Sequence, residues 1–236
     1  MAKSHLKSIA APGSWRVKRK GFKFITRPRP SGHSLDMCLP LNVVMRDMLD
    51  YANTTKEVKY ILNNEEVLVD GTRRKDPKLA IGFMDVLTFS KLKESYRVLI
   101  DEKGFLKLIK ISGTETTLKP AKILGKKILK GGKTQLNLSF GLNILVKKDE
   151  YKCGDTLVLQ MPNLETKHYY RLEKNSYIFL TSGGHVGDHG VVESIDEKFI
   201  IYKSHKGDTF TTRREFAIVI GDKKPVISLI PEVEGG

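Results

Sequence analysis

The sequence predicts an α+β fold that is mostly β, in which a basic N-terminal extension precedes three small folded units. One region, residues 40–64, has apolar residues three and four positions apart, which is the spacing of an amphipathic helix. Almost every apolar segment after it is short and bounded by glycine or other turn-forming residues, as strands are. With 236 residues, of which 40% are hydrophobic, the chain can form several small cores.

The N-terminal extension comprises residues 1–38. Its first 35 residues contain nine Lys and Arg and no Asp or Glu, and turn-forming residues interrupt them. Such a segment has too little apolar area to offset the entropy lost on ordering, so we expect it to be mobile until a polyanion neutralises it. Trp15, the only tryptophan, is suited to stacking on a base or docking into a partner. The alternative is a solvated tail without a partner.

Two short helices joined by a tight turn are expected at the start of the second unit. The first runs from Pro40, a residue favoured in the first helical turn, to Leu49. Thr54 or Thr55 can cap the second helix, and Glu57 is well placed in its first turn.

A β-hairpin completes this second unit, which spans residues 39–92. Asp70-Gly71 follows the apolar run Val67–Val69 and is a strong two-residue hairpin signal. We expect Gly71 to serve the turn, which requires positive φ, and not a ligand contact. The chain then returns to strand at residues 81–87.

The third unit, residues 93–176, is expected to be barrel-like because short strands recur along it. The expected strands are residues 97–100, 105–110, 136–138, 143–146 and 156–159. Eight lysines and no acid lie between Thr116 and Lys148. A solvated barrel face is the ordinary explanation for such lysines, but the lack of any compensating acid favours an anionic partner.

The fourth unit, residues 177–236, is expected to be a small SH3-like barrel. Glycines at 183, 184, 187 and 190 open it, and short strands follow at residues 199–202 and 216–220. His185 and His189 have the i, i+4 spacing of a helical metal site, but the four glycines argue against a helix there, so no metal site is expected.

Charge is the strongest indicator of the partner. The net charge is +14, of which residues 1–35 carry +9 and residues 105–180 carry +8, while the other two segments are nearly balanced. A polyanion is the natural partner of such a chain. A lipid surface is the rival, but neither basic segment has the pattern of an amphipathic helix. The apolar runs are too short to span a bilayer, and no signal-peptide pattern begins the chain.

The sequence gives little support for an enzyme or for a protein held together by disulfides or zinc. Cys38 and Cys153 are the only cysteines and form no CxxC pair, which fits a reduced cytoplasm and argues against a disulfide framework or a zinc ribbon. The sequence contains no HExxH, no Walker loop, no nucleophile elbow and no GxGxxG after a strand. We therefore expect no catalytic residue, no metal and no cofactor.

Three local patterns resemble known RNA-binding motifs. Residues 41–87 resemble the alpha-L RNA-binding fold, with a helix-turn-helix followed by Val67-x-Val69-Asp70-Gly71 and by Ile81-Gly82-x-x-Asp85-Val86. Gly184-x-x-Gly187-x-x-Gly190-Val191 resembles the KOW motif of RNA-binding barrels. The opening His5-Leu6-Lys7-x-Ile9-Ala10-Ala11-Pro12-x-x-Trp15 resembles the N-terminal signature of the archaeal and eukaryotic e-type small-subunit ribosomal protein four family.

Further segments resemble the same family, namely Leu39-Pro40-Leu41, Gly82-Phe83-Met84-Asp85-Val86 and Lys224-Pro225-Val226-Ile227-Ser228-Leu229. The resemblance covers nearly the whole chain in the family's order. It implies a structural, non-enzymatic component of the small ribosomal subunit in the cytoplasm. Its implied partners are 16S-type small-subunit rRNA and neighbouring small-subunit ribosomal proteins, with no membrane and no small-molecule substrate. It also implies an alpha-L domain and a C-terminal KOW barrel.

Two positions depart from the family pattern. Ser139-Phe140-Gly141-Leu142-Asn143 stands where the family has a run containing Arg, a strong phosphate ligand, so an RNA contact at this loop is in doubt. Asp188 stands where the KOW loop has a basic residue, and an acid facing phosphate would be repulsive. The final barrel would then contact protein, or RNA through another face.

The candidate RNA-binding residues are the basic side chains of the extension, the helix and hairpin unit, and the lysine-rich segment. A solubilising role is the alternative for each of them. They are Lys3, His5, Lys7, Trp15, Arg16, Lys18, Arg19, Lys20, Lys23, Arg27, Arg29, Arg46, Lys56, Lys59, Arg73, Arg74, Lys75, Lys119, Lys122, Lys126, Lys127, Lys130 and Lys133.

Two other functions fit the same residues. One is an RNA-modification enzyme or its accessory protein, and the other is a free-standing RNA-binding regulator. Deleting residues 2–30 is expected to weaken RNA binding and to flatten its salt dependence.

Overall fold

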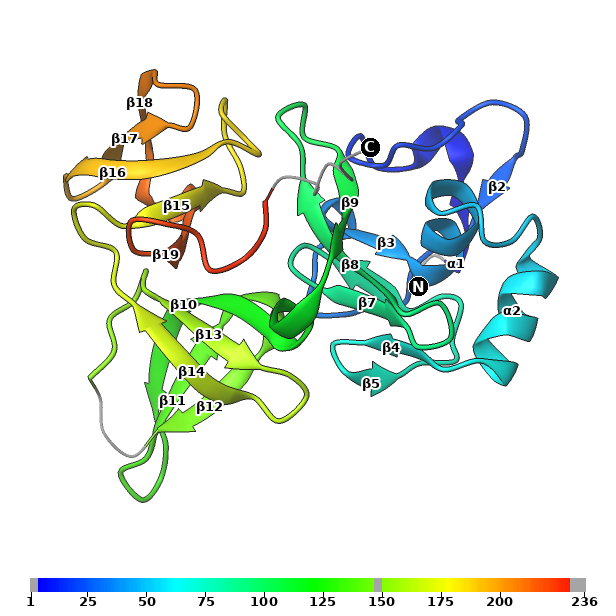
Figure 1. Ribbon diagram of the computed structural model, residues 1–236, viewed down its shortest axis with the longest axis horizontal. Coiled ribbons are helices and arrows are strands. Elements are labelled where there is room, and N and C mark those ends of the chain that lie inside the picture. Colours follow the sequence, from blue (N-terminus) through cyan, green and yellow to red (C-terminus); the bar gives the residue numbers. More distant parts are fainter. Residues whose placement is uncertain (1–3, 147–149, 230–236) are drawn as a thin grey trace.

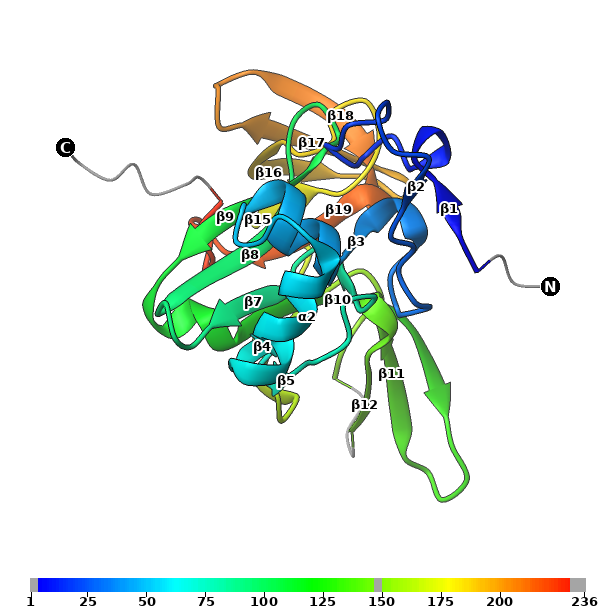
Figure 2. The same ribbon diagram turned by 90° about the vertical axis from the view of Figure 1, so that its right-hand side faces the viewer.

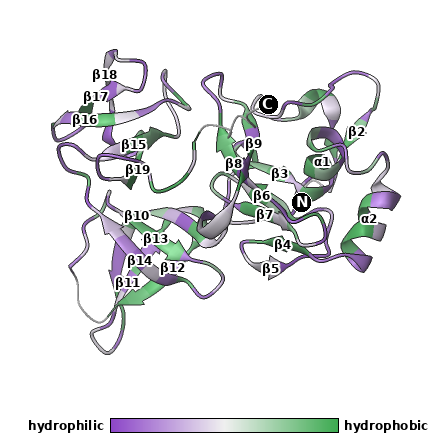
Figure 3. Ribbon diagram, in the orientation of Figure 1, coloured by the Kyte–Doolittle hydropathy of each residue, from purple (hydrophilic) through white to green (hydrophobic). Residues whose placement is uncertain are grey.

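The computed structural model describes residues 4–146 and 150–229, and within these ranges the chain is mostly β. Its strands form three five-stranded antiparallel sheets and two two-stranded ribbons. Figure 1 shows the first sheet and the helices on one side of the molecule and the other two sheets on the opposite side. Hydrophobic residues concentrate in the sheet strands, and the connecting loops are mostly hydrophilic (Figure 3).

The first sheet has the strand order β5-β4-β7-β8-β9. These strands are β4 (Val67–Val69), β5 (Thr72–Arg73), β7 (Val86–Phe89), β8 (Glu94–Ile100) and β9 (Leu106–Ile111). The predicted boundary after residue 92 falls between β7 and β8, which are hydrogen-bonded neighbours in this sheet. The hairpin of residues 94–111 therefore extends the sheet that β4 and β7 begin.

The predicted hairpin turn is confirmed. Asp70 and Gly71 both have positive φ, 49° and 71°, as a two-residue turn of type I′ requires. Asp70 also uses its side chain, because its Oδ1 accepts a hydrogen bond from the backbone N–H of Val86 at 2.9 Å. The turn thereby holds a carboxylate against the start of β7.

Two helical segments cover one edge of this sheet (Figure 1). The second is α2 (Thr55–Asn64), and Thr54 is its cap: the Thr54 Oγ1 accepts a hydrogen bond from the N–H of Glu57 at 3.3 Å. Glu57 in turn accepts one from the N–H of Asn53 at 2.8 Å, so the two side chains form a capping box. Of the two candidate caps, Thr54 is therefore the one that caps the helix, and Thr55 is its first residue.

The first helical segment differs from the expected single α-helix. It consists of α1 (Leu41–Val43) and a wider π-helical segment, Val44–Met48. In that segment the carbonyl of Val44 accepts from the N–H of Leu49, five residues on, at 3.0 Å. The apolar spacing identified a helical segment but not its pitch, because both kinds of turn bury a similar stripe of side chains. The strand β3 (Cys38–Pro40) leads directly into α1 and forms a two-stranded ribbon with β6 (Ala80–Gly82).

The central sheet has the order β12-β11-β10-β13-β14. Its strands are β10 (Leu118–Ile128), β11 (Thr134–Leu138), β12 (Asn143–Val146), β13 (Thr156–Gln160) and β14 (Glu165–Tyr170). The long strand β10 pairs with β13 along its first half and with β11 along its second half. The hairpin of β10 and β11 projects away from the body, as Figure 2 shows. Sequence reasoning had found β11, β12 and β13 but not β10 or β14.

The C-terminal sheet has the order β18-β17-β16-β15-β19. Its strands are β15 (Tyr177–Leu180), β16 (His189–Ile195), β17 (Phe199–Ser204), β18 (Thr209–Arg213) and β19 (Ala217–Gly221). The N–H of Val219 donates to the Thr156 Oγ1 at 3.1 Å, so β19 is joined to the central sheet. The two sheets therefore pack as one body.

Asp188 does not face outward, which corrects the expectation of an acid directed at phosphate. Its carboxylate is largely buried and accepts hydrogen bonds from the hydroxyls of Tyr202 and Ser204, at 2.8 and 2.9 Å. It also contacts the Nδ1 of His205 at 3.1 Å. The residue organises the opening loop of the sheet from inside, so it does not bear on whether this sheet contacts RNA.

Beside Asp188, two stacked histidines predict a pH dependence of stability. The rings of His189 and His205 lie 4.3 Å apart, and burial, followed by the neighbouring His205, lowers the pKa of His189 to about 4. A lowered histidine pKa means that the unfolded chain binds more protons, so stability is lost as pH falls from about 6.5 towards 4. The loss should be on the order of 1–2 kcal/mol once solvent screening is allowed for.

Denaturant unfolding at pH 7 and pH 5 measures this effect. In His189→Gln the loss of stability between pH 7 and pH 5 should be smaller than in wild type by the amount that His189 contributes. His168→Gln, at an exposed position, should show the same loss as wild type. Identical pH profiles for wild type and His189→Gln would contradict the assignment.

The extension is folded against the first sheet, which corrects the expectation of a mobile arm. Trp15 is only 1% exposed and lies in the main apolar core. The N–H of Leu106, in β9, donates to the carbonyl of Ser14, the residue before Trp15, at 2.9 Å. The composition of the extension concealed this packing, because a few buried side chains, Trp15, Leu6 and Ala11, fix a segment that is otherwise largely polar. Trp15 is therefore a core residue and not a base-stacking one.

Among the residues that the structure describes, no helix has the length and apolar character needed to cross a bilayer.

Candidate nucleic-acid interface

The loop between the two short strands of the extension presents a cluster of cations to solvent. These strands, β1 (Leu6–Lys7) and β2 (Phe24–Ile25), pair antiparallel and so close the loop at its base. Arg16, Lys18, Lys20 and Lys23 are all exposed on or beside it. Of these four, only Arg16 contacts an acid within the described chain, the Asp101 carboxylate at 3.5 Å. The cluster therefore retains most of its positive charge for a partner.

A groove of about 610 Å³ runs between this loop and the helical segments. The loop contributes cations and aromatic rings to one wall, and the turn after the first helical segment contributes acids and amides to the other. Arg46, on that second wall, forms two hydrogen bonds with Asp47, at 3.0 and 2.8 Å. Among the side chains that line it are those of Arg16, Lys18, Lys20, Phe22, Phe24, Arg46, Asp47, Asp50 and Asn53. We call this the extension groove.

Other candidates in the extension have internal partners. The Arg19 guanidinium donates to the carbonyls of Ala11 and Pro12, at 2.7 and 2.8 Å, and so holds the loop in shape. Arg29 forms an ion pair with Asp76 at 2.8 Å. His5 packs edge-on against Phe24, with ring centroids 5.5 Å apart. Lys7 is exposed and Arg27 is half-buried, while Lys3 lies outside the described residues.

A second group of cations lies on α2 and the adjoining hairpin. Lys56 and Lys59 are exposed on α2, and Arg73, Arg74 and Lys75 are exposed after the Asp70-Gly71 turn. Arg73 also donates to the carbonyl of Asn63 at 3.2 Å, which joins β5 to the end of α2. The three cations after the turn are therefore accessible to a partner.

Lys119 is not available to RNA, which corrects its assignment as a contact. It is 3% exposed, and its ammonium forms ion pairs with Asp70 and Asp85. The Asp85 carboxylate also contacts the Nε2 of His33, from the extension, at 3.1 Å. Lys119 lies on β10, so these contacts join the central sheet to the first sheet and to the extension.

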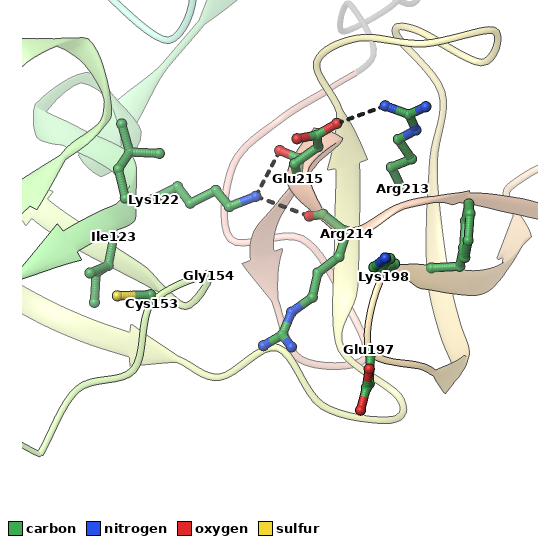
Figure 4. Close-up of a pocket in the computed structure, with 11 residues that line it drawn as sticks. Lys122, Ile123, Cys153, Gly154, Glu197, Lys198, Arg213, Arg214 and Glu215 are labelled. Atoms are coloured by element: carbon green, nitrogen blue, oxygen red, sulfur yellow. Dashed lines mark hydrogen bonds and ion pairs between the residues drawn. The ribbon is translucent and has the colours of Figure 1, made fainter.

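Lys122 is also engaged internally, which corrects a second assignment. Its ammonium donates to the carbonyls of Arg214, Glu215 and Ala217, at 3.1, 2.8 and 2.7 Å. Burial, followed by the nearby Arg214 guanidinium, lowers the pKa of Lys122 to about 8. The side chain links β10 to the loop before β19, and Figure 4 shows it reaching across between them.

Figure 4 shows a second cavity, of about 590 Å³, beside Lys122. Ile123, Leu124 and Phe199 supply apolar surface, and Lys198 and Arg214 are among the cations that border it. The lining includes the thiol of Cys153, but among the described residues no hydrogen bond or ion pair links this thiol to a base. The cavity marks the joint between the central and C-terminal sheets.

Four remaining lysines lie on the projecting hairpin of β10 and β11. Lys127, Lys130 and Lys133 are exposed there, and Lys126 is half-buried. Figure 2 shows this hairpin extending well beyond the rest of the molecule. A projecting, lysine-rich hairpin is suited to reaching between the helices of a folded RNA.

The loop at residues 139–143, where the family's arginine is missing, packs against the extension. Phe140 adopts a φ of 66° and its ring stacks on that of His33, with centroids 5.1 Å apart. Phe83 contacts Phe140 from another side, at 5.9 Å. This loop therefore has an intramolecular role.

Sequence reasoning missed two aromatic residues, Phe22 and Phe24. They are 81% and 52% exposed and line the extension groove. The pattern Gly21-Phe22-Lys23-Phe24, in which aromatic residues alternate with a cation in a basic loop, carried the signal. Among the described residues, no group of three or more His, Cys, Asp or Glu side chains is arranged to hold a metal ion.

Comparisons with known proteins agree with one another. The profile of the Ribosomal family S4e matches residues 92–166, and that of the RS4NT (NUC023) domain matches residues 2–36. The small ribosomal subunit protein eS4 of Methanocaldococcus jannaschii is 38% identical, over 96% of this chain and 98% of its own length. The eS4 protein of Methanosphaera stadtmanae is 38% identical over 97% of each chain.

A solved structure shows the same likeness in three dimensions. The crystal structure of the 30S ribosomal protein S4e from Thermoplasma acidophilum matches with a TM-score of 0.69 and 27% sequence identity. The match covers 82% of this chain and 99% of that one.

Proposed function

Because the chain belongs to the ribosomal S4e family, whose archaeal members are named small ribosomal subunit protein eS4, we propose that it is a structural constituent of the small ribosomal subunit that binds and stabilises small-subunit rRNA. The observation that carries the RNA-binding part is the exposed cation cluster of the extension. Lys18, Lys20 and Lys23 have no acidic partner within the described chain and so offer their full charge to phosphates.

The finer architecture supports the same proposal. The two helical segments, the Asp70-Gly71 hairpin and the paired strands β4 and β7 occur in the order expected for the alpha-L RNA-binding domain that the sequence resembles, which supports the proposal that residues 39–92 form such a domain. In the C-terminal sheet, the glycine-rich segment that resembles a KOW motif joins β15 to β16. We propose that the alpha-L unit presents Lys56, Lys59 and residues 73–75 to an RNA junction.

A ribosomal constituent acts without catalysis and works in the cytoplasm beside other small-subunit proteins. The projecting hairpin of β10 and β11 is the part best suited to enter between RNA helices, because it is basic and narrow (Figure 2). The extension presents its cations on the surface loop between β1 and β2. The C-terminal sheet is nearly neutral in charge and is suited to protein neighbours.

Sedimentation tests this proposal. The protein should travel almost entirely with small subunits through a moderate-salt wash, and the purified chain should bind small-subunit rRNA more tightly than heparin, an equally acidic polymer. A protein that is largely free in gradients, as an RNA-modification enzyme or a free-standing regulator would be, and that binds heparin equally well, would contradict it.

A further inference from the structure

Phe22 and Phe24 are unusually exposed for phenylalanines. Phe22 is 81% exposed, and among the described residues its ring has no aromatic or cationic neighbour. Phe24 is 52% exposed, with His5 against its edge and the Lys23 ammonium 5.5 Å from its ring centroid. Exposed rings of this kind, close together on one loop, are characteristic of binding surfaces and not of a packed core.

The extension groove places these rings next to charges of opposite kinds on its two walls. Arg16, Lys18 and Lys20 stand on the same wall as the rings. Asp50 and Asn53 stand on the opposite wall, and the Asp50 carboxylate has no hydrogen-bond or ion-pair partner in the described chain. The volume, about 610 Å³, is that of a small-molecule site and accommodates a nucleotide.

This arrangement selects against regular duplex RNA. In an A-form helix the base faces are stacked on one another, so an aromatic side chain can stack only on a base that is unpaired. Cations beside the rings suit the phosphates that flank such a base, while an acid on the far wall repels phosphate and accepts hydrogen bonds from base amino groups.

We propose that the extension groove binds an unpaired nucleotide of an RNA, with its base stacked on Phe22 or Phe24 and its flanking phosphates on Arg16, Lys18 and Lys20. The base's hydrogen-bonding edge faces Asp50 and Asn53. This inference rests on the proposed RNA-binding function and adds the class of RNA element that the extension recognises.

Two short RNA hairpins test it, one with a single bulged adenine and one fully paired but otherwise the same. The wild-type chain should bind the bulged hairpin more tightly. Phe22→Ala together with Phe24→Ala should weaken binding of the bulged hairpin by roughly 5- to 150-fold, the range expected from loss of one base stack. Binding of the paired hairpin and the salt dependence of binding should not change, because no cation is removed.

A fluorescent base gives an independent readout. With 2-aminopurine at the bulge, wild-type protein should quench the fluorescence through stacking, and the double alanine variant should not. Phe22→Trp should preserve both quenching and affinity. Leu92→Ala, which removes another half-exposed apolar side chain outside the groove, is the matched control and should behave as wild type.

The outcomes distinguish failure of the nucleotide site from failure of the proposed rRNA-binding function. If the double alanine variant binds the bulged hairpin as well as wild type does, or if Phe22 crosslinks to a protein segment in intact small subunits, the nucleotide site is wrong and rRNA binding can still stand. If neither hairpin nor small-subunit rRNA binds in preference to heparin, the proposed function fails as well.

Discussion

Replacing Lys119 with Met should lower the free energy of unfolding by about 3–5 kcal/mol, a large fraction of the stability of a typical domain. Lys119 is the one cation that contacts both Asp70 and Asp85 in the described part of the chain, and all three side chains are largely buried. Methionine fills a similar volume but carries no charge. The loss therefore comes from two buried carboxylates that have lost their ammonium partner, and not from a cavity.

The pKa values of the two carboxylates show how the network is balanced. Desolvation alone would raise the pKa of Asp85, but Lys119 and His33 outweigh it and hold the pKa at about 2. Burial, followed by the charge of Asp85, raises the pKa of Asp70, because one ammonium cannot fully compensate two carboxylates. Without Lys119 the folded-state pKa of Asp85 should rise above that of the unfolded chain, and the pKa of Asp70, already raised, should rise further.

The sign of that rise gives the experiment a second readout. A carboxylate whose folded pKa lies above its unfolded pKa favours the folded state at low pH, so Lys119→Met should approach wild-type stability as pH falls from 7 towards 4. Combining Lys119→Met with Asp70→Asn should recover part of the loss at pH 7, since one of the two unpaired charges is then gone.

Denaturant unfolding measures these differences, and the matched control is Lys127→Met, an exposed lysine on the same strand β10. That variant should change stability by less than about 0.5 kcal/mol. Equal, small effects of Lys119→Met and Lys127→Met would show that the buried network contributes nothing to the fold.

Local signals in the sequence were sufficient for the elements that depend on neighbouring residues. The capping box of Thr54 and Glu57 and the turn at Asp70-Gly71 each involve only residues close together in the sequence, so they could be identified without knowledge of the rest of the chain. The helical segment before them was located but its pitch was not, because side-chain spacing does not distinguish an α-turn from a π-turn.

The sequence could not show which basic residues are internal. Lys119 and Lys127 lie on one strand in one lysine-rich run, yet one is buried between two acids and the other is exposed. The acids that engage Lys119 are 34 and 49 residues away in sequence. Trp15 was misassigned for the same reason, since the core that receives it is formed by later parts of the chain.

Burial of Trp15 changes how the extension should be tested for RNA binding. Deleting residues 2–30 would remove a core side chain together with the cations, and the loss of a buried tryptophan costs about 3–5 kcal/mol. Weak binding by such a variant would not distinguish a misfolded protein from the loss of phosphate contacts. Substituting exposed cations leaves Trp15 and the internal contacts of Arg19 in place.

Changing Arg16, Lys18, Lys20 and Lys23 together to Gln should weaken rRNA binding by about a thousandfold at physiological salt, if each contacts one phosphate. The slope of log affinity against log salt should become shallower by roughly 3, since each lost contact removes about 0.7–0.9. Filter-binding titrations over a range of salt concentrations measure both quantities.

The control for this fourfold variant changes four exposed cations elsewhere, Lys91, Lys93, Lys103 and Lys174, to Gln. It has the same net charge, so it separates contacts made by the extension from attraction that depends only on total charge. The two variants should differ in slope by nearly the full amount predicted for four contacts.

If both variants lower the slope equally, the rRNA responds to the net charge of the whole molecule and the extension is not its principal binding element. If only the extension variant does so, the folded loop between β1 and β2 makes the phosphate contacts, and its shape, held by Arg19 and Trp15, determines where on the RNA they fall.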